Sequence, residues 1–171
     1  MKFSLITVTF NSGQTIRNTF DSVLKQTYSD FEYILIDGSS KDNTLDFINE
    51  YVSKFNGRLR WISEKDDGLY DAMNKGFSMA TGDVIGIINS DDVLADPAAI
   101  EKVVKCFERD ETIDAVYADL YYVAQNDISK IVRHWVSGEQ RSFAKGWHPA
   151  HPTFYVKKEV YHKYGAFDLD F

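Results

Sequence analysis

Cysteine, clustered positive charge and long apolar runs are all scarce in this sequence. Its one cysteine, Cys106, allows no disulfide within the chain, which favours a reducing compartment. No block of lysine and arginine occurs and the net charge is −7, which excludes the basic surface that nucleic-acid binding requires. The first apolar run turns polar at Asn11, too early for a signal core or a membrane span. We expect a cytoplasmic protein without a nucleic-acid partner.

Internal repeats and linkers rich in proline or glycine are also absent. With 171 residues, of which 44% are apolar and 15% aromatic, the chain can bury a core of its own. We therefore expect residues 1–171 to form a single domain. Cys106 has helical spacing with Val103 and Phe107, so we expect it to be buried as a small hydrophobic residue.

Apolar runs alternate with helical patterns along the chain, which predicts an α/β fold with a mostly parallel sheet flanked by helices. Strands are expected at 3–10, 31–37, 59–63 and 84–89, and helices at 15–26, 44–55, 69–80 and 97–108. Pro97 suits the first turn of the last of these helices. Two later strands, 115–123 and 130–136, are expected to form a ribbon partly outside the parallel core.

Polar and acidic residues follow each of the four expected parallel strands. Thr9 and Asn11 end the first strand and Asp37 ends the second, while 64–67 and 89–92 follow the third and fourth. Because the carboxyl ends of parallel strands share one edge of the sheet, we expect these groups to line a ligand site there. Turns are often polar for other reasons, so each position alone is ambiguous.

Asp91 and Asp92 stand side by side at the end of an apolar strand. Neighbouring carboxylates repel unless a cation neutralises them, and carboxylate oxygens suit Mg²⁺ or Mn²⁺. Such a cation completes its shell with substrate phosphates, so the pair predicts a diphosphate ligand. The competing interpretation is that one aspartate only caps the next helix, although Asp96 lies nearer to its start.

Three stretches together resemble the family 2 glycosyltransferases of the GT-A fold, the bacterial polysaccharide-assembly type. These stretches are "SLITVTFNSGQTIRNTFDSVLKQTY", "EYILIDGSSKDNT" and "AMNKGFSMATGDVIGIINSDDVL". The resemblance implies a Rossmann-like GT-A sheet and transfer of a sugar, with inversion, from a nucleoside diphosphate sugar, usually a UDP-sugar. It implies a saccharide or lipid-linked saccharide as acceptor and is compatible with peripheral association with the inner face of the membrane.

The resemblance also implies roles for particular residues. It places Thr9 and Asn11 at the nucleotide and Asp37 against the base. "NSDD" stands where the family carries its DxD-type motif, which places Asp91 near the ribose or sugar and Asp92 on the metal, as catalytic residues. The motif begins with Asn89 rather than Asp, which removes one charge from the expected metal site.

Further site residues follow from the same resemblance. Many relatives read "ARNxG" where this chain has "AMNKG", so Met73 replaces an arginine, and we assign Asn74 and Lys75 to the nucleotide-sugar. Asp66 is a further binding candidate. For Asp71, a site role and a solvated helix face are equally good interpretations.

The segment "GWHPAHPTFYVKKEVYHKYGAFDLD" resembles the acceptor side of the family, and His151 is assigned there as a catalytic residue that contacts donor phosphate or acceptor. The aspartate that serves relatives as catalytic base would follow this segment, so we expect a domain truncated at its C-terminal end that binds donor better than it turns it over. A nucleotide-sugar-binding module without chemistry is the alternative. Other α/β nucleotide enzymes are disfavoured because neither GxGxxG nor GxxxxGK[ST] follows the first strand.

Overall fold

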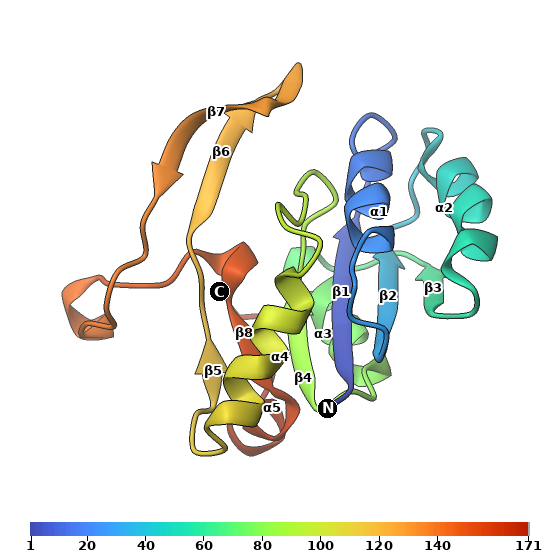
Figure 1. Cartoon of the computed structure of the whole chain (residues 1–171). Helices are drawn as coiled ribbons and strands as arrows, with labels where there is room; N and C mark the ends of the chain where they lie inside the picture. The colour runs from blue at the N-terminus through green and yellow to red at the C-terminus, as the bar shows by residue number, and fades with distance from the viewer. Residues whose placement is uncertain (171) are drawn as a thin grey trace.

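The computed structural model describes residues 1–170, which form a six-stranded sheet with helices on both faces and a two-stranded ribbon (Figure 1). The strands of the sheet, in spatial order, are β3 (Leu59–Ser63), β2 (Phe31–Asp37), β1 (Phe3–Thr9), β4 (Val84–Ile87), β8 (Tyr155–Lys157) and β5 (Ala115–Val116). The ribbon is formed by β6 (Leu120–Ala124) and β7 (Asp127–Trp135). The helices are α1 (Ile16–Leu24), α2 (Thr44–Val52), α3 (Leu69–Met79), α4 (Ala99–Arg109) and α5 (Lys158–Tyr164). The first four strands in this order are parallel, so the expectation of a mostly parallel sheet is confirmed.

Both faces of the central strands are covered, because every residue of β1 and β2 is buried. Successive strand side chains point to opposite faces. Phe3 and Leu5 therefore join the core cluster that contains α1, α2 and α4, whereas Ile6 and Val8 join the cluster that contains α3. Burial on both faces explains why these strands read as continuous apolar runs rather than as alternating ones.

The order of strands reverses between β1 and β4. β2 and β3 extend the sheet on one side of β1, while β4 pairs with its other side. The carboxyl ends of β1 and β4 therefore flank the switch point at which open α/β sheets bind ligands. The hydroxyl groups of Ser12 and Ser90 form a 2.7 Å hydrogen bond there, which ties together the loops that follow the two strands.

The expected strands 31–37 and 59–63 coincide with β2 and β3, but helix ends differ from expectation. The helix expected at 44–55 gives way at Val52 to a 3-10 turn, after which Asn56 has the left-handed φ of 51°. The helix expected at 97–108 begins later, at Ala99. The carbonyl of Pro97 accepts the N–H of Thr27 at 2.8 Å instead of a helical N–H, which keeps Pro97 outside the helix.

The expectation that Cys106 is buried is wrong, because it is exposed. Helix α4 buries Ile100, Val103, Val104 and Phe107, and this narrow stripe leaves Cys106 on the solvent side. Met73 has the opposite environment, since it is fully buried in the core against α3's face of the sheet. Its side chain therefore serves packing.

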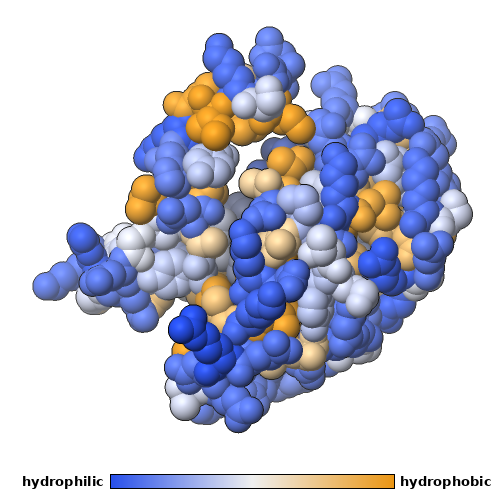
Figure 2. Space-filling model, viewed as in Figure 1, coloured by the Kyte–Doolittle hydropathy of each residue, from blue (hydrophilic) through white to orange (hydrophobic). Residues whose placement is uncertain are grey.

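The expected strand 115–123 is interrupted, and its second half forms the ribbon with β7 outside the main sheet, as expected (Figure 1). Hydrophobic side chains gather on the surface of this ribbon (Figure 2). Ile128, Ile131 and Val132 are 49%, 55% and 60% exposed. The rest of the described chain therefore does not cover the ribbon. No helix between residues 1 and 170 has the length and apolar character needed to cross a bilayer.

Candidate functional site

The carboxyl end of β1 carries a buried hydroxyl without a hydrogen-bond partner. Thr9 is 5% exposed, and within residues 1–170 its Oγ1 is the one buried side-chain nitrogen or oxygen that lacks a partner. Burial of a hydroxyl without a partner costs free energy. The strand therefore ends in a polar group that an arriving ligand can satisfy.

The loop after β1 is held to the loop after β2 through Asn11. Its backbone has the left-handed φ of 51°, its N–H donates to Ser40 Oγ at 2.8 Å, and its side-chain oxygen accepts the N–H of Lys41 at 2.8 Å. Between Thr9 and Asn11, the ring of Phe10 is 63% exposed. An exposed aromatic ring at this edge is a feature that the sequence analysis missed, although its position in "VTFNS" was the available signal.

Asp37 ends β2 and has no exposed surface. Its carboxylate accepts the N–H of Ser40 at 3.0 Å and the hydroxyl of Ser63 at 2.6 Å, and it also accepts the Ser40 hydroxyl. Most of its lone pairs are therefore used within the chain. A contact between this carboxylate and a nucleotide base stays a prediction.

Asp91 and Asp92 follow β4 at the same edge, with Asp91 exposed and Asp92 half-buried. Asn89 donates its amide N–H to Asp92 Oδ2 at 2.8 Å and so orients Asp92. The hydroxyl of Thr19 donates to the backbone carbonyl of Asp92 at 2.8 Å, which fixes the loop. Neither aspartate caps α4, because that helix has no side-chain capping hydrogen bond; Asp96 accepts the N–H of Ala98 at 2.8 Å just before it.

The electrostatic environment of Asp92 is unfavourable for its negative charge. Burial raises its pKa, and the charge of Asp91 raises it further, against the opposing effects of Asn89 and His151. His151 begins a 3-10 turn, His151–Thr153, that packs against β4. Burial lowers the pKa of His151, while the charge of Asp92 opposes this effect. The structure thus brings His151 close to Asp92, although the two lie far apart in sequence.

The candidates around α3 have partners within the chain. The carboxylate of Asp66 accepts the N–H of Gly68 at 3.1 Å. Lys75 pairs with Glu64 at 2.9 Å and with Asp71 at 3.2 Å, so Asp71 is more than a solvated position on the helix. The pKa of Lys75 is raised, first by its bond to Glu64.

Asn74 is joined to the C-terminal segment rather than to the strand edge. Its amide nitrogen donates to the carbonyl of Phe167 at 2.8 Å, and its oxygen accepts the N–H of Phe167 at 3.0 Å. A ligand contact by Asn74 would require these two bonds to be exchanged. The assignments of Asn74 and Lys75 to the nucleotide-sugar therefore stay predictions.

A divalent cation fits this edge only with help from a ligand. Residues 1–170 contain no group of three or more His, Cys, Asp or Glu side chains that could hold a metal. Mg²⁺ and similar cations, however, are commonly held by one or two carboxylates and completed by water and substrate phosphates. Asp92, whose pKa is raised and which has Asp91 next to it in sequence, is a candidate for such a metal-ligating carboxylate.

Comparison with curated proteins finds relatives of this chain among glycosyltransferases and polysaccharide synthases. A "PGL/p-HBAD biosynthesis glycosyltransferase" of Mycobacterium bovis (strain BCG / Pasteur 1173P2) is 36% identical over 124 residues, which cover 72% of this chain and 48% of that protein. A chondroitin synthase of Pasteurella multocida (strain Pm70) is 38% identical over 108 residues, 63% of this chain and 11% of the synthase. The chain spans about half the length, or less, of these curated relatives.

Solved structures show the same fold. The mannosyltransferase PcManGT from Pyrobaculum calidifontis, in complex with GDP-Man and Mn²⁺, matches with a TM-score of 0.77 at 21% identity and covers 99% of this chain and 48% of that one. S. aureus TarS 1-349 in complex with UDP-GlcNAc matches with a TM-score of 0.72 at 20% identity and covers 95% of this chain and 47% of that one. The expected GT-A fold is thereby confirmed. The model of the family described as "Glycosyl transferase family 2" matches residues 4–165. The chain belongs to that family.

Proposed function

We propose that this chain, as a single domain over residues 1–171, binds the donor of an inverting glycosyltransferase that acts in bacterial surface-polysaccharide synthesis. The donor would be a nucleoside diphosphate sugar, with UDP as the first nucleotide to test. The observation that carries the proposal is the half-buried carboxylate of Asp92, whose pKa is raised, at the switch point of the sheet. One structural neighbour binds UDP-GlcNAc and another binds GDP-Man with Mn²⁺, which supports this class of donor.

The nucleotide would lie across the ends of β1 and β2. The unpartnered hydroxyl of Thr9 is available to a polar group of the ligand, and the exposed ring of Phe10 offers a face for a base. Asn11 shapes the loop between them, and Asp37 holds the neighbouring loop through Ser40. In this proposal Asp66 lies at the same edge. Its Oδ2 is so close to Gly38, which follows β2, that a Cβ added at Gly38 would lie 2.6 Å from it.

Asp92 would hold Mg²⁺ or Mn²⁺ together with the donor diphosphate, and Asp91 would contact the ribose or the sugar. Such a cation acts as a Lewis acid and screens the charge that grows on a departing diphosphate. Asn89 keeps Asp92 Oδ2 oriented through its 2.8 Å hydrogen bond. Because burial lowers the pKa of His151, its imidazole is neutral near pH 7 and can donate or accept one hydrogen bond from donor or acceptor.

A nucleotide-sugar-binding module without chemistry is the second candidate. We favour it because Asp168, after α5, accepts the backbone N–H of Asp170 at 3.0 Å and so, in this proposal, orients the chain rather than serving as a base. We further propose that residues 1–171 bind donor better than they turn it over, with a saccharide or lipid-linked saccharide as acceptor. Efficient sugar transfer by this polypeptide would exclude the second candidate. A cytoplasmic location at the inner face of the membrane stays a prediction.

Calorimetric titration with UDP, GDP and dTDP, each with and without Mn²⁺, tests the proposal. We expect UDP to bind more tightly with Mn²⁺ than without it. Asp92→Asn should lower the UDP affinity in the presence of Mn²⁺ by at least about tenfold, as expected for loss of a metal ligand. Asp114→Asn is the matched control, because Asp114 is exposed and precedes β5 at the opposite edge of the sheet. If Asp92→Asn leaves the Mn²⁺-assisted affinity unchanged, Asp92 does not hold the cation.

A further inference from the structure

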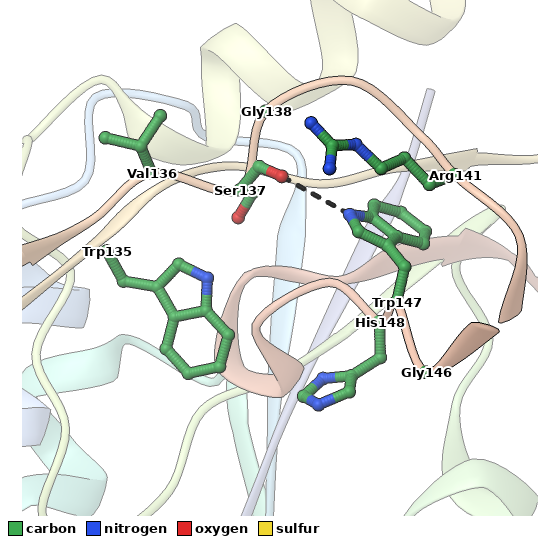
Figure 3. A pocket seen from close by; sticks show the side chains of 8 residues that line it. All are labelled: Trp135, Val136, Ser137, Gly138, Arg141, Gly146, Trp147 and His148. Carbon is green, nitrogen blue, oxygen red and sulfur yellow. Dashed lines mark hydrogen bonds between the residues drawn. The ribbon is translucent and has the colours of Figure 1, made fainter.

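A second concave site lies outside the switch point, between the end of β7 and the segment that leads back to the sheet (Figure 3). Its cavity has a volume of about 350 Å³. It is lined by Trp135, Val136, Ser137, Gly138, Arg141, Gly146, Trp147 and His148. Functional pockets begin at roughly 300 Å³, so this one has room for a sugar unit.

Two tryptophans form walls of this cavity, and neighbouring aromatic rings hold them. The indole N–H of Trp147 donates to the carbonyl of Ser137 at 3.4 Å, and its ring meets Tyr117 edge-on at 5.4 Å between centroids. Trp135 packs edge-on against His148 at 5.9 Å. In Figure 3 the two indoles stand on different sides of the cavity, and the guanidinium of Arg133 lies 5.8 Å from the centroid of the Trp135 ring.

The Ser137–Gly138 stretch of the cavity is hydrogen-bonded to residues 117–119, which connect β5 to β6. The N–H of Ser137 donates to Asp119 Oδ1 at 2.9 Å, and its hydroxyl donates to the carbonyl of Ala118 at 2.8 Å. Tyr117 donates its hydroxyl to the carbonyl of Gly138 at 2.9 Å. The Ser137–Gly138 stretch therefore has fixed positions for a ligand to meet.

Arg141 brings positive charge to the same cavity. Its guanidinium extends toward Ser137 and Gly138 in the view of Figure 3, and among residues 1–170 no carboxylate lies within ion-pair distance of it. The stretch 130–148 contains four Lys or Arg residues and one acidic residue, Glu139, although the whole chain has a net charge of −7. The cavity is lined by the cation Arg141 and by no carboxylate, although Asp119 accepts the N–H of its Ser137, so an anionic ligand is favoured on the Arg141 side.

This cavity lies within reach of the donor site. His148 lines it, and His151, three residues later, is close enough to Asp92 to feel its charge. Three residues of extended chain span at most about 11 Å. A saccharide of two or three units in the cavity could therefore place its end beside Asp92.

We propose that this cavity binds the acceptor through a sugar unit that carries an anionic group, either a carboxylate or a phosphate; the inference rests on the proposed function. The apolar face of a pyranose ring would pack on Trp135 or Trp147. The guanidinium of Arg141 would bind two oxygens of the anion, because its fork of donors matches carboxylate and phosphate geometry. A neutral sugar would keep the ring contacts and lose the charged one.

Intrinsic fluorescence of residues 1–171 tests this proposal, since two of the three tryptophans line the cavity. The protein is titrated with glucuronic acid, glucose 1-phosphate and glucose. We expect at least one of the two anionic sugars to bind more tightly than glucose. The anion that binds better identifies the source of the charge.

The variants Arg141→Gln and Lys145→Gln form a matched pair, because both residues are exposed cations of this segment and Lys145 does not line the cavity. Arg141→Gln should weaken binding of the anionic sugar by about tenfold, the effect of losing a charge-assisted hydrogen bond, and leave glucose unchanged. Lys145→Gln should change neither. Equal effects of the two variants, equal affinity for all three sugars, or no change in fluorescence would overturn the proposal.

A UDP titration of the same samples separates this inference from the proposed function. Arg141→Gln should bind UDP as the unchanged chain does, because Arg141 is not part of the strand edge that would hold the nucleotide. If UDP binds and no anionic sugar does, the cavity proposal fails alone. If UDP does not bind, the proposed donor function fails, whatever the sugars show.

Discussion

His151 lies close enough to Asp92 for the charge of each group to act on the other. Burial raises the pKa of Asp92, and the neighbouring imidazole opposes that rise. Burial lowers the pKa of His151, and the carboxylate opposes that fall. The pair joins the loop after β4 to the turn before β8, two segments that only the folded chain brings together.

This relationship predicts the titration of His151. We expect its pKa to lie below the ordinary 6.5, and Asp92→Asn to lower it further, because the carboxylate that stabilises the imidazolium is removed. Asp91→Asn is the control and should have the smaller effect, since Asp91 acts on Asp92 and is not among the groups that shift His151. NMR titration of the imidazole resonances measures both variants. An unchanged pKa in Asp92→Asn would contradict the proximity.

The raised pKa of Asp92 also predicts how a cation affects stability. Because ionisation of Asp92 is less favourable in the folded state, the folded protein loses stability as the pH rises from 3.8 through the raised pKa. A cation bound to the carboxylate would offset this loss. We expect Mn²⁺ to raise Tm at pH 7 by about 2–4 °C, the shift that 1 kcal/mol produces in a chain of this size. Calorimetric scans should show no such rise below pH 3.8, or in Asp92→Asn at pH 7.

Thr9 and Thr7 form a matched pair on one strand. Thr9→Val removes a buried hydroxyl that has no partner, so we expect stability to be unchanged or higher while UDP affinity falls. Thr7→Val removes the acceptor of the Tyr33 hydroxyl, 2.9 Å away, and should destabilise the protein by about 1–3 kcal/mol. Urea unfolding and UDP titration compare the two variants. A stability loss in Thr9→Val as large as that in Thr7→Val would show that its hydroxyl serves the fold.

We expect Glu32 to make the free energy of unfolding sensitive to acid. Burial by itself would raise its pKa, but hydrogen bonds from Ser4, Thr81 and Arg60 lower it to about 2. Its contribution is therefore complete above pH 4.5 and is lost as the pH falls toward 2. Glu32→Gln should cost about 1–3 kcal/mol at pH 7, with a difference that shrinks below pH 4.5. Glu50→Gln, which breaks an exposed ion pair, should have little effect in the same urea titrations.

Helix α3 packs so closely on the sheet at Gly76 that we expect no larger residue to fit there without cost. A Cβ at this position would lie 2.5 Å from Cγ2 of Ile6 in β1. Gly76→Ala should therefore cost about 1–3 kcal/mol through overpacking, although alanine favours a helix. Ser78→Ala, on the exposed side of the same helix, should not destabilise. Equal unfolding midpoints for the two variants would mean that the helix shifts without cost.

The first four helices and the four parallel strands were predictable because their signals are local, whereas β8 and α5 were not expected. β2 and β3 have the bounds expected from their apolar runs, and α3 begins where expected at Leu69. Errors arose where a distant contact decides the outcome. Pro97 stays outside α4 because its carbonyl bonds the N–H of Thr27, and no local pattern reveals that partner.

The sequence by itself determined the order of the first four helices and the four parallel strands, the family and the cluster of acidic residues after β4, because each depends on neighbouring residues. Only the tertiary structure decided that Thr9 Oγ1 lacks a partner among residues 1–170, that the charges of His151 and Asp92 act on each other, and that Arg141 shares a cavity with two tryptophans. These relationships join segments far apart along the chain. Their burial and charge depend on packing across the sheet, which periodicity and spacing do not encode.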